Sequence, residues 1–136
     1  MDLPTVPFST VHSLETISST LEGLIISANY SGDELVLKEY PNLLSIHFSG
    51  YHTWKTNRVS ITSCPRLQFI ISELGSLCCI PDEGVIGGAV ISNCPQLVMI
   101  SLGVSSFEFF QSFELSGKFQ FLVTKTRPSL TCLLDH

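Results

Sequence analysis

Cysteine and histidine side chains can bind a metal ion or act as nucleophiles, and this chain has five cysteines and four histidines. Cys64 and Cys94 each precede a proline in matching sequence contexts, so a metal site or a disulfide between them has to be considered. A third copy of the same context has Tyr40 at this position, and a shared set of ligands would not accept that replacement. We therefore expect Cys64 and Cys94 to be buried thiols, because free cysteine behaves as a small apolar residue.

The remaining pairs of cysteines and histidines lack the spacing of a metal site. Cys78 and Cys79 are adjacent and do not have the C-x-x-C spacing of zinc or redox pairs. His47 and His52 are five residues apart, on a predicted strand and turn, so their side chains should point apart. We expect no metal ion and no cofactor.

Catalytic motifs are also missing from the sequence. It contains neither a nucleophile motif of the form G-x-S-x-G nor a phosphate-binding loop with its lysine. The glycine-rich stretch Gly84-Val-Ile-Gly-Gly88 matches neither pattern. The sequence therefore predicts a protein that is not an enzyme.

Charge and hydropathy exclude two classes of partner. The formal net charge is -5, and no lysine or arginine occurs between residues 67 and 117, so phosphate groups would be repelled there. The first residues lack the basic and apolar regions of a signal peptide, and no apolar run approaches the ~18 residues of a membrane span. We expect no nucleic-acid partner, no membrane association and a cytoplasmic location.

An internal repeat must position these side chains. Residues 35–48, 59–72 and 89–102 share one pattern: an apolar residue, x, I/L, x, x, C/Y, P, x, L, x, x, I. A degraded copy contains Leu21, and a later one is anchored by either Phe119 or Phe121, of which Phe121 keeps the six-residue step seen from Ile91 to Leu97. The anchor leucines of the first four copies, Leu21, Leu43, Leu67 and Leu97, are spaced by 22, 24 and 30 residues. Repetition at such a period is typical of stacked repeats.

Spacing within each copy predicts two short strands. Apolar residues alternate with period two in pairs such as Leu35/Leu37 and Val59/Ile61, and long helical periodicity is absent. We predict a β-rich repeat solenoid over residues 21–126, with about four to five irregular units and little helix. Residues 1–20 would be an N-terminal tail or irregular cap, and residues 127–136 a C-terminal segment. The predicted repeat core consists of Leu43, Ile46, Leu67, Ile70, Leu97, Ile100, Cys64 and Cys94.

The repeat resembles that of the leucine-rich-repeat superfamily. The resemblance is carried by L-x-x-I-x-apolar preceded by Cys-Pro, with Ser106-Phe107 and Phe113-Glu-Leu115 between units. It is similar to the irregular type found in protist and BspA-like proteins. The position of the family's asparagine ladder is occupied by Glu39, Ser63 and Asn93 in turn. The resemblance implies a curved solenoid whose exposed strand face binds a protein or peptide.

Strand alternation predicts which side chains form that face, because residues on either side of the inward isoleucine should point outward. Stacking would align Gly23, Ser45, Phe69 and Met99 in one column and Ile25, His47, Ile71 and Ser101 in another. Phe69, Ile71 and Met99 are large and apolar, so they would form an apolar patch. The alternative is that another segment covers them and makes them core. The predicted binding residues are Ser45, His47, Phe69, Ile71, Met99 and Ser101.

Two functions fit this pattern, and a thiol-dependent enzyme that uses Cys78 and Cys79 is a third alternative. The first is a non-enzymatic module that binds a protein or peptide ligand through its strand face. The second is a structural subunit that self-associates by stacking through its open ends, because uncapped repeats leave unpaired strands at each end.

Overall fold

The computed structural model describes residues 6–11, 17–27, 33–49, 56–72, 87–102, 110–116, 121–124 and 134–135. Within these ranges all regular secondary structure is β-strand, and there is no helix. The prediction of a β-rich fold with little helix is therefore confirmed for the described residues. The strands are β1 (Phe8–Val11), β2 (Gly23–Ser27), β3 (Glu34–Lys38), β4 (Ser45–Ser49), β5 (Arg58–Thr62), β6 (Phe69–Ser72), β7 (Gly87–Ser92), β8 (Met99–Leu102), β9 (Phe110–Ser116), β10 (Phe121–Thr124) and β11 (Leu134–Asp135).

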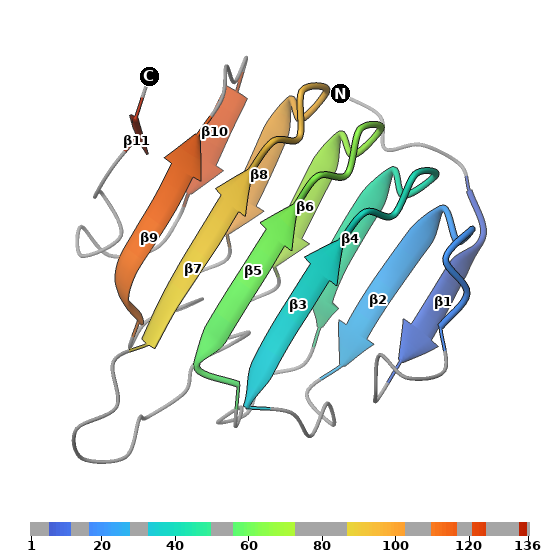
Figure 1. Ribbon diagram of the computed structural model, residues 1–136, viewed down its shortest axis with the longest axis horizontal. Coiled ribbons are helices and arrows are strands. Elements are labelled where there is room, and N and C mark those ends of the chain that lie inside the picture. The colour runs from blue at the N-terminus through green and yellow to red at the C-terminus, as the bar shows by residue number, and fades with distance from the viewer. Residues whose placement is uncertain are drawn as a thin grey trace.

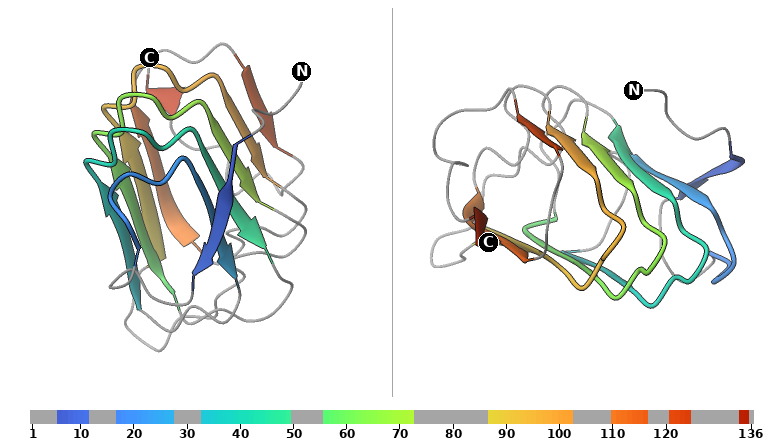
Figure 2. Two further views of the ribbon diagram at one scale, coloured as in Figure 1. Left: turned by 90° about the vertical axis from the view of Figure 1, so that its right-hand side faces the viewer. Right: turned by 90° about the horizontal axis from the view of Figure 1, so that it is seen from above.

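The strands form two parallel sheets that face each other (Figures 1 and 2). Sheet A has the strand order β1-β2-β4-β6-β8-β10, and sheet B has the order β11-β9-β7-β5-β3. From β2 to β11 the chain alternates between the two sheets, so each strand pairs with the strand two positions along the chain. This alternation supplies the crossover that neighbouring parallel strands require.

The copies of the sequence repeat lie side by side in register. In sheet B, Leu37 pairs with Ile61 and Ile61 with Ile91. In sheet A, Ile46 pairs with Ile70 and Ile70 with Ile100. The period-two apolar pairs therefore belong to strands, as the sequence predicts, and equivalent residues of successive copies are neighbours.

The core fills the space between the sheets. Its side chains come from the inward positions of both sheets and from the segments that join them. The eight residues expected in the repeat core are all buried, and Cys94 is the most exposed of them at 8%. Burial of these aliphatic side chains supplies the main free energy of folding, at about 1.5–3 kcal/mol for each fully buried one.

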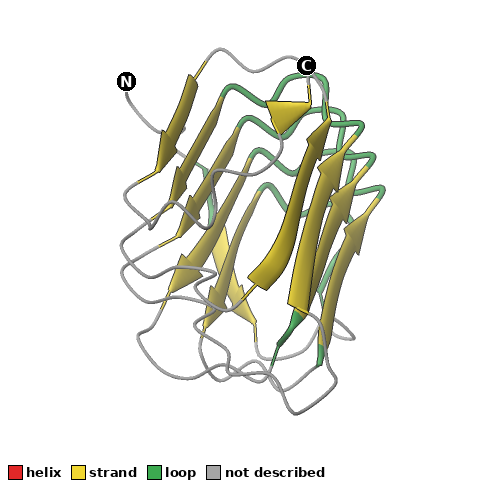
Figure 3. Ribbon diagram, turned by 90° about the vertical axis from the view of Figure 1, so that its left-hand side faces the viewer, coloured by secondary structure: helices red, strands yellow, loops and turns green. Residues whose placement is uncertain are grey.

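Six-residue corners, 39–44, 63–68 and 93–98, join sheet B to sheet A (Figure 3). In the last two, the backbone N–H of Leu67 donates to the Cys64 carbonyl at 3.2 Å, and that of Leu97 donates to the Cys94 carbonyl at 3.1 Å. Proline follows the cysteine in both turns, at the position where its fixed φ favours a β-turn. The Cys-Pro-x-Leu motif is therefore a turn signal that redirects the chain.

The residue before each of these turns has left-handed backbone geometry. The φ values are 61° at Glu39, 55° at Ser63 and 53° at Asn93. The backbone N–H of Glu39 donates to the Thr62 carbonyl at 3.2 Å, and that of Ser63 donates to the Ser92 carbonyl at the same distance. These hydrogen bonds continue the ladder of sheet B around the bend.

Two strands lie in the segments expected to be end regions. β1 pairs with β2, so part of residues 1–20 belongs to sheet A. β11 pairs with β9 in sheet B, within residues 127–136. No helix long and apolar enough to cross a membrane occurs among the described residues.

Candidate functional site

The outer face of sheet B presents a column of side chains that the sequence reading did not select. Val36 lies beside Ser60, Ser60 beside Val90, and Val90 beside Glu114. These residues point outward because their neighbours Leu35 and Leu37, on either side of Val36, are fully buried. Val36 and Val90 remain 48% and 37% exposed, and they are the large apolar side chains left exposed among the described residues.

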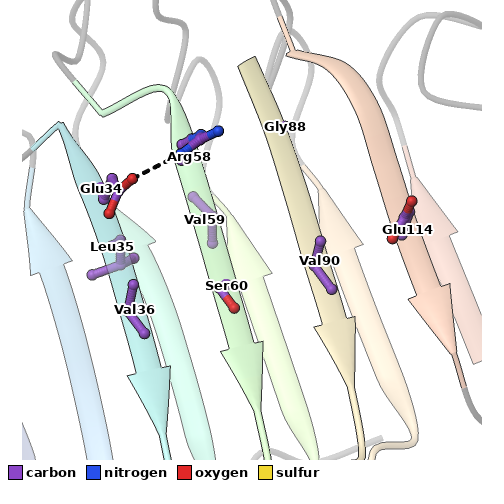
Figure 4. A pocket seen from close by; sticks show the side chains of 9 residues that line it. All are labelled: Glu34, Leu35, Val36, Arg58, Val59, Ser60, Gly88, Val90 and Glu114. Atoms are coloured by element: carbon purple, nitrogen blue, oxygen red, sulfur yellow. Dashed lines mark hydrogen bonds and ion pairs between the residues drawn. The ribbon is translucent and has the colours of Figure 1, made fainter. Parts of the chain in front are cut away.

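A shallow groove of about 520 Å³ runs over this column (Figure 4). It exists because Ser60 and Gly88, which are small, lie between larger neighbours on β3, β5 and β7. Gly88 pairs with Arg58, so the space beside the arginine is not filled by a side chain from β7. The groove is lined by Glu34, Leu35, Val36, Arg58, Val59, Ser60, Gly88, Val90 and Glu114.

Charge is distributed unevenly along the groove. Arg58 Nη1 donates to Glu34 Oε1 at 3.0 Å, and this pair is largely exposed, so it contributes at most about 1 kcal/mol to stability. Glu114 is exposed at the opposite end, and no described cation pairs with it. The lining therefore carries an apolar middle, a neutralised pair at one end and, at the other, a carboxylate that no described cation neutralises.

The outer face of sheet A contains the two columns that the sequence predicts. The register aligns Gly23, Ser45, Phe69 and Met99, and it aligns Ile25, His47, Ile71 and Ser101. Ser45 and Phe69, however, are buried, with exposures of 0% and 4%. His47, Ile71, Met99 and Ser101 are half-buried. Ser45 and Phe69 therefore do not belong to an exposed patch, whereas a binding role for the other four stays a prediction.

Phe8 of β1 explains part of this burial. A Cβ added to Gly23 would lie 2.7 Å from the Phe8 ring, so that ring rests directly on the glycine. The Phe8 ring also packs against the His47 ring, with centroids 4.9 Å apart and planes tilted by 54°. Phe8, from the residues expected to be a tail or an irregular cap, thus covers Gly23 and packs against His47 on this face.

The two corner cysteines lie where the sequence places them. Cys64 and Cys94 are free and buried. A hydrogen bond from the Cys94 thiol lowers the pKa of Cys64 to about 7. That same hydrogen bond, followed by burial, raises the pKa of Cys94. Cys78, Cys79 and His52 lie outside the described residues, and within those residues no three histidine, cysteine or acidic side chains are placed to hold a metal ion.

The sheet B groove had a signal in the sequence. Val36 lies between Leu35 and Leu37, and Val90 lies between Ala89 and Ile91, so each strand has three consecutive apolar residues. In a strand with two inward apolar positions, the residue between them must point outward. An apolar residue there indicates an exposed apolar side chain, and reading the outer residues of both sheets would have found it.

Comparisons with protein-family models, with curated proteins and with solved structures give no match. No relative therefore supplies a ligand or an active site for this chain. The candidate surfaces are those that the described residues form themselves, namely the groove of sheet B and the half-buried face of sheet A.

Proposed function

We propose that this chain is a β-solenoid of leucine-rich-repeat type that binds an extended peptide segment of a partner protein and catalyses no reaction. The in-register copies of the repeat support the solenoid, because each copy leaves an apolar edge that the next copy covers. The flat, two-sheet arrangement provides long outer faces on which a peptide can lie across several strands (Figure 2).

The observation that carries this proposal is the groove on the outer face of sheet B. Exposed apolar side chains that line a hollow are typical of ligand-binding grooves. Val36 and Val90 are both exposed, and both line it. Covering these two valines with apolar groups of a ligand would remove their surface from water and stabilise the complex.

The charges of the groove favour a basic ligand. Glu34 is paired with Arg58, whereas Glu114 is available to a cation. A lysine or arginine of the ligand would form its ion pair beside the apolar side chains, where screening by solvent is reduced. The net charge of -5 would also speed the approach of a basic peptide.

Dimensions define the sequence of such a peptide. Four neighbouring strands separate Val36 from Glu114 by three strand spacings, or ~14 Å. An extended peptide rises ~3.3 Å per residue and directs alternate side chains to one face, so five residues span ~13 Å. The pattern apolar-x-apolar-x-basic would therefore place its first apolar side chain at Val36, its second at ~7 Å, between Ser60 and Val90, and its cation near Glu114.

The composition of the groove supports binding rather than catalysis. The described residues that line it include neither histidine nor cysteine, and Ser60 carries the one hydroxyl group among them. Arg58 is already engaged by Glu34. A hydroxyl without a neighbouring base is a weak nucleophile, so this surface is suited to recognition.

Fluorescence anisotropy with two labelled peptides tests the proposal. One peptide carries Leu-Ser-Leu-Ser-Lys between glycine spacers, and the other has glutamate in place of lysine. We expect the basic peptide to bind and the acidic one to bind at least tenfold more weakly. Val36→Asp combined with Val90→Asp should abolish binding, and Glu114→Lys should reverse the preference for charge.

Matched controls separate the two faces. Val36 and Val90 are exposed, so their replacement should leave the circular dichroism spectrum unchanged. Ser101→Asp places the same charge on the outer face of sheet A and should not affect binding. If Ser101→Asp abolishes binding while the valine variants bind normally, the site is on sheet A. If neither peptide binds at millimolar concentration, the proposed peptide specificity is wrong.

Self-association through end strands remains the second proposal. Among the described strands, sheet B ends at β3 and sheet A ends at β10, and an end strand without a neighbour can pair with another chain. Sedimentation velocity of the full chain distinguishes the two functions: a stable monomer supports free recognition, and an obligate oligomer supports assembly. We also propose a cytoplasmic location, which is consistent with the free thiols of Cys64 and Cys94.

A further inference from the structure

Cys64 and Cys94 occupy equivalent positions in neighbouring corners. Thr62 pairs with Ser92 at the end of β5 and β7, and each cysteine follows two residues later. The backbone N–H of Ser63 donates to the Ser92 carbonyl at 3.2 Å, so the two backbone segments stay adjacent beyond the ends of β5 and β7. Adjacent parallel strands are ~4.8 Å apart, and the Cα atoms of a disulfide are usually ~4.4–6.8 Å apart. The backbone therefore holds the two cysteines at a separation that a disulfide can span.

The thiols of both cysteines are arranged alike. Cys64 Sγ donates to the Thr62 carbonyl oxygen at 3.5 Å, and Cys94 Sγ donates to the Ser92 carbonyl oxygen at 3.3 Å. Each thiol therefore bends back toward the strand that precedes it, on the buried side of its corner. The Cys94 thiol can also donate to Cys64, which holds the pKa of Cys64 at about 7. At neutral pH a large fraction of Cys64 is then thiolate, the nucleophilic form.

The corner at residues 39–44 has no cysteine, so Cys64 and Cys94 are the one pair of thiols in the three corners. Tyr40 has the position of the cysteines in the preceding copy and packs half-buried against the core. Burial, followed by the charge of Cys64, raises the pKa of Tyr40. A phenol does not form a disulfide. Among these three corners, oxidation can therefore link only the corner of Cys64 to the corner of Cys94.

We propose that Cys64 and Cys94 are a site of reversible oxidative modification, at which hydrogen peroxide converts the two thiols into a disulfide that links neighbouring corners. The exposures of the two residues are 0% and 8%, so a small oxidant is required to reach them. This inference is independent of peptide binding, because the corner lies at the ends of the strands that carry the groove.

The reaction has two steps. The Cys64 thiolate attacks one peroxide oxygen, so that an S–O bond forms and the O–O bond breaks, and the hydroxide that leaves takes a proton from solvent. Cys64 is then a sulfenic acid, and the peroxide has accepted two electrons. The Cys94 sulfur attacks the Cys64 sulfur, so that the S–S bond forms and the S–O bond breaks. Hydroxide leaves with the Cys94 proton as water, and two thiols and one peroxide yield one disulfide and two water molecules.

Peptide mapping of the oxidised full chain tests the proposal. Cys78, Cys79 and Cys132 lie outside the described residues and are replaced by serine, so that Cys64 and Cys94 are the remaining thiols. Folded protein is treated with hydrogen peroxide, quenched by alkylation and digested with trypsin without reduction. Cleavage after arginine and lysine separates Cys64, in residues 59–66, from Cys94, in residues 67–118.

We expect these two peptides to be recovered as one linked species that dithiothreitol separates. The oxidised chain should unfold at a higher urea concentration than the reduced chain, because the disulfide closes a loop in the unfolded state. The rate of linkage should rise about tenfold per pH unit below the pKa of the attacking thiolate and level off above it.

Three results would overturn the proposal. The first is oxidation of Cys64 to sulfinic acid without linkage, and the second is linkage that occurs only between chains. The third is a peroxide-treated chain whose two thiols are still fully alkylated after unfolding. The variants Cys64→Ser and Cys94→Ser serve as controls, since each keeps one thiol and should form no linked peptide while retaining the circular dichroism spectrum of the parent.

Discussion

Replacing Ser63 by asparagine should stabilise the protein through the stacked corners. Ser63 has a φ of 55°, a left-handed conformation that asparagine adopts more readily than serine. Asn93 is the equivalent residue of the next copy, with a φ of 53°, and its Nδ2 donates to Ser63 Oγ at 3.0 Å. Ser63→Asn would therefore place two asparagines one above the other, next to Glu39 of the preceding copy.

The expected gain is about 1 kcal/mol, from two contributions. A left-handed conformation costs an ordinary L-residue about 1–2 kcal/mol, and asparagine recovers part of that cost by hydrogen bonding locally. The new amide can also donate to the carboxylate or backbone of Glu39 while its oxygen accepts from Asn93. One such hydrogen bond contributes about 0.5–1.5 kcal/mol, toward the low end here because Asn93 is exposed.

Urea unfolding followed by circular dichroism measures this gain. With a slope of roughly 2 kcal/mol per molar urea, an increase of about 1 kcal/mol raises the midpoint by about 0.5 M. Thr62→Asn is the matched control, since it places the same side chain in extended backbone and should leave the midpoint unchanged or lower it. Asn93→Ser should lower the midpoint by a similar amount. The account of the corners fails if Ser63→Asn and Asn93→Ser both leave the midpoint unchanged.

Three further changes test the core, the covered face of sheet A and the corner thiols. Leu67→Ala should lower the free energy of unfolding by about 2–5 kcal/mol, because Leu67 is buried. Arg66→Ala, on the exposed turn, should change it by less than about 0.5 kcal/mol. Equal effects of the two substitutions would place Leu67 outside the core. Gly23→Ala should lower the free energy of unfolding by about 1–3 kcal/mol, since the added Cβ would overlap the Phe8 ring. The same substitution should have a far smaller effect in a Phe8→Ala background. An equal loss in that background would rule out the ring as the cause. The pKa of Cys64 is about 7, below its ordinary 9.0, so the folded chain binds fewer protons than the unfolded chain between pH 7 and 9. The contribution of Cys64 to stability therefore increases from pH 7 to 9 and is lost as the pH falls through 7. Urea midpoints of the parent and Cys64→Ala, compared from pH 6 to 9, should diverge as the pH rises, and parallel curves would contradict the lowered pKa.

The strands and core could be predicted because they depend on local alternation and on repetition. Leu37, Ile61 and Ile91 alternate with outward residues, and the repeat places them at equivalent positions. Equivalent residues of stacked copies must be neighbours, so the two columns of sheet A also follow from the sequence. The Cys-Pro-x-Leu motif was visible in the sequence, although the left-handed geometry of the residue before it was not.

Contacts between distant segments could not be predicted in this way. Phe8 belongs to no copy of the repeat and follows Pro7, so nothing local indicates that its ring covers Gly23 and His47. Phe69 is buried although it occupies an outward position of its strand, so strand alternation alone does not predict its exposure. The sheet B groove depends on the small size of Gly88 beside Arg58, which only the register between strands reveals.

The equal length of three corners divides the middle of the molecule into a fixed side and a variable side. The corners 39–44, 63–68 and 93–98 each have six residues, whereas the segments that lead from sheet A to sheet B before each of them, 28–33, 50–57 and 73–86, have six, eight and fourteen. Chain length can thus change on the return side while the register of the strands stays the same, because closing a longer loop adds only about 0.6 kcal/mol per doubling of its length. Residues inserted between positions 73 and 86 would accordingly lengthen the return side without altering the register of the stacked corners.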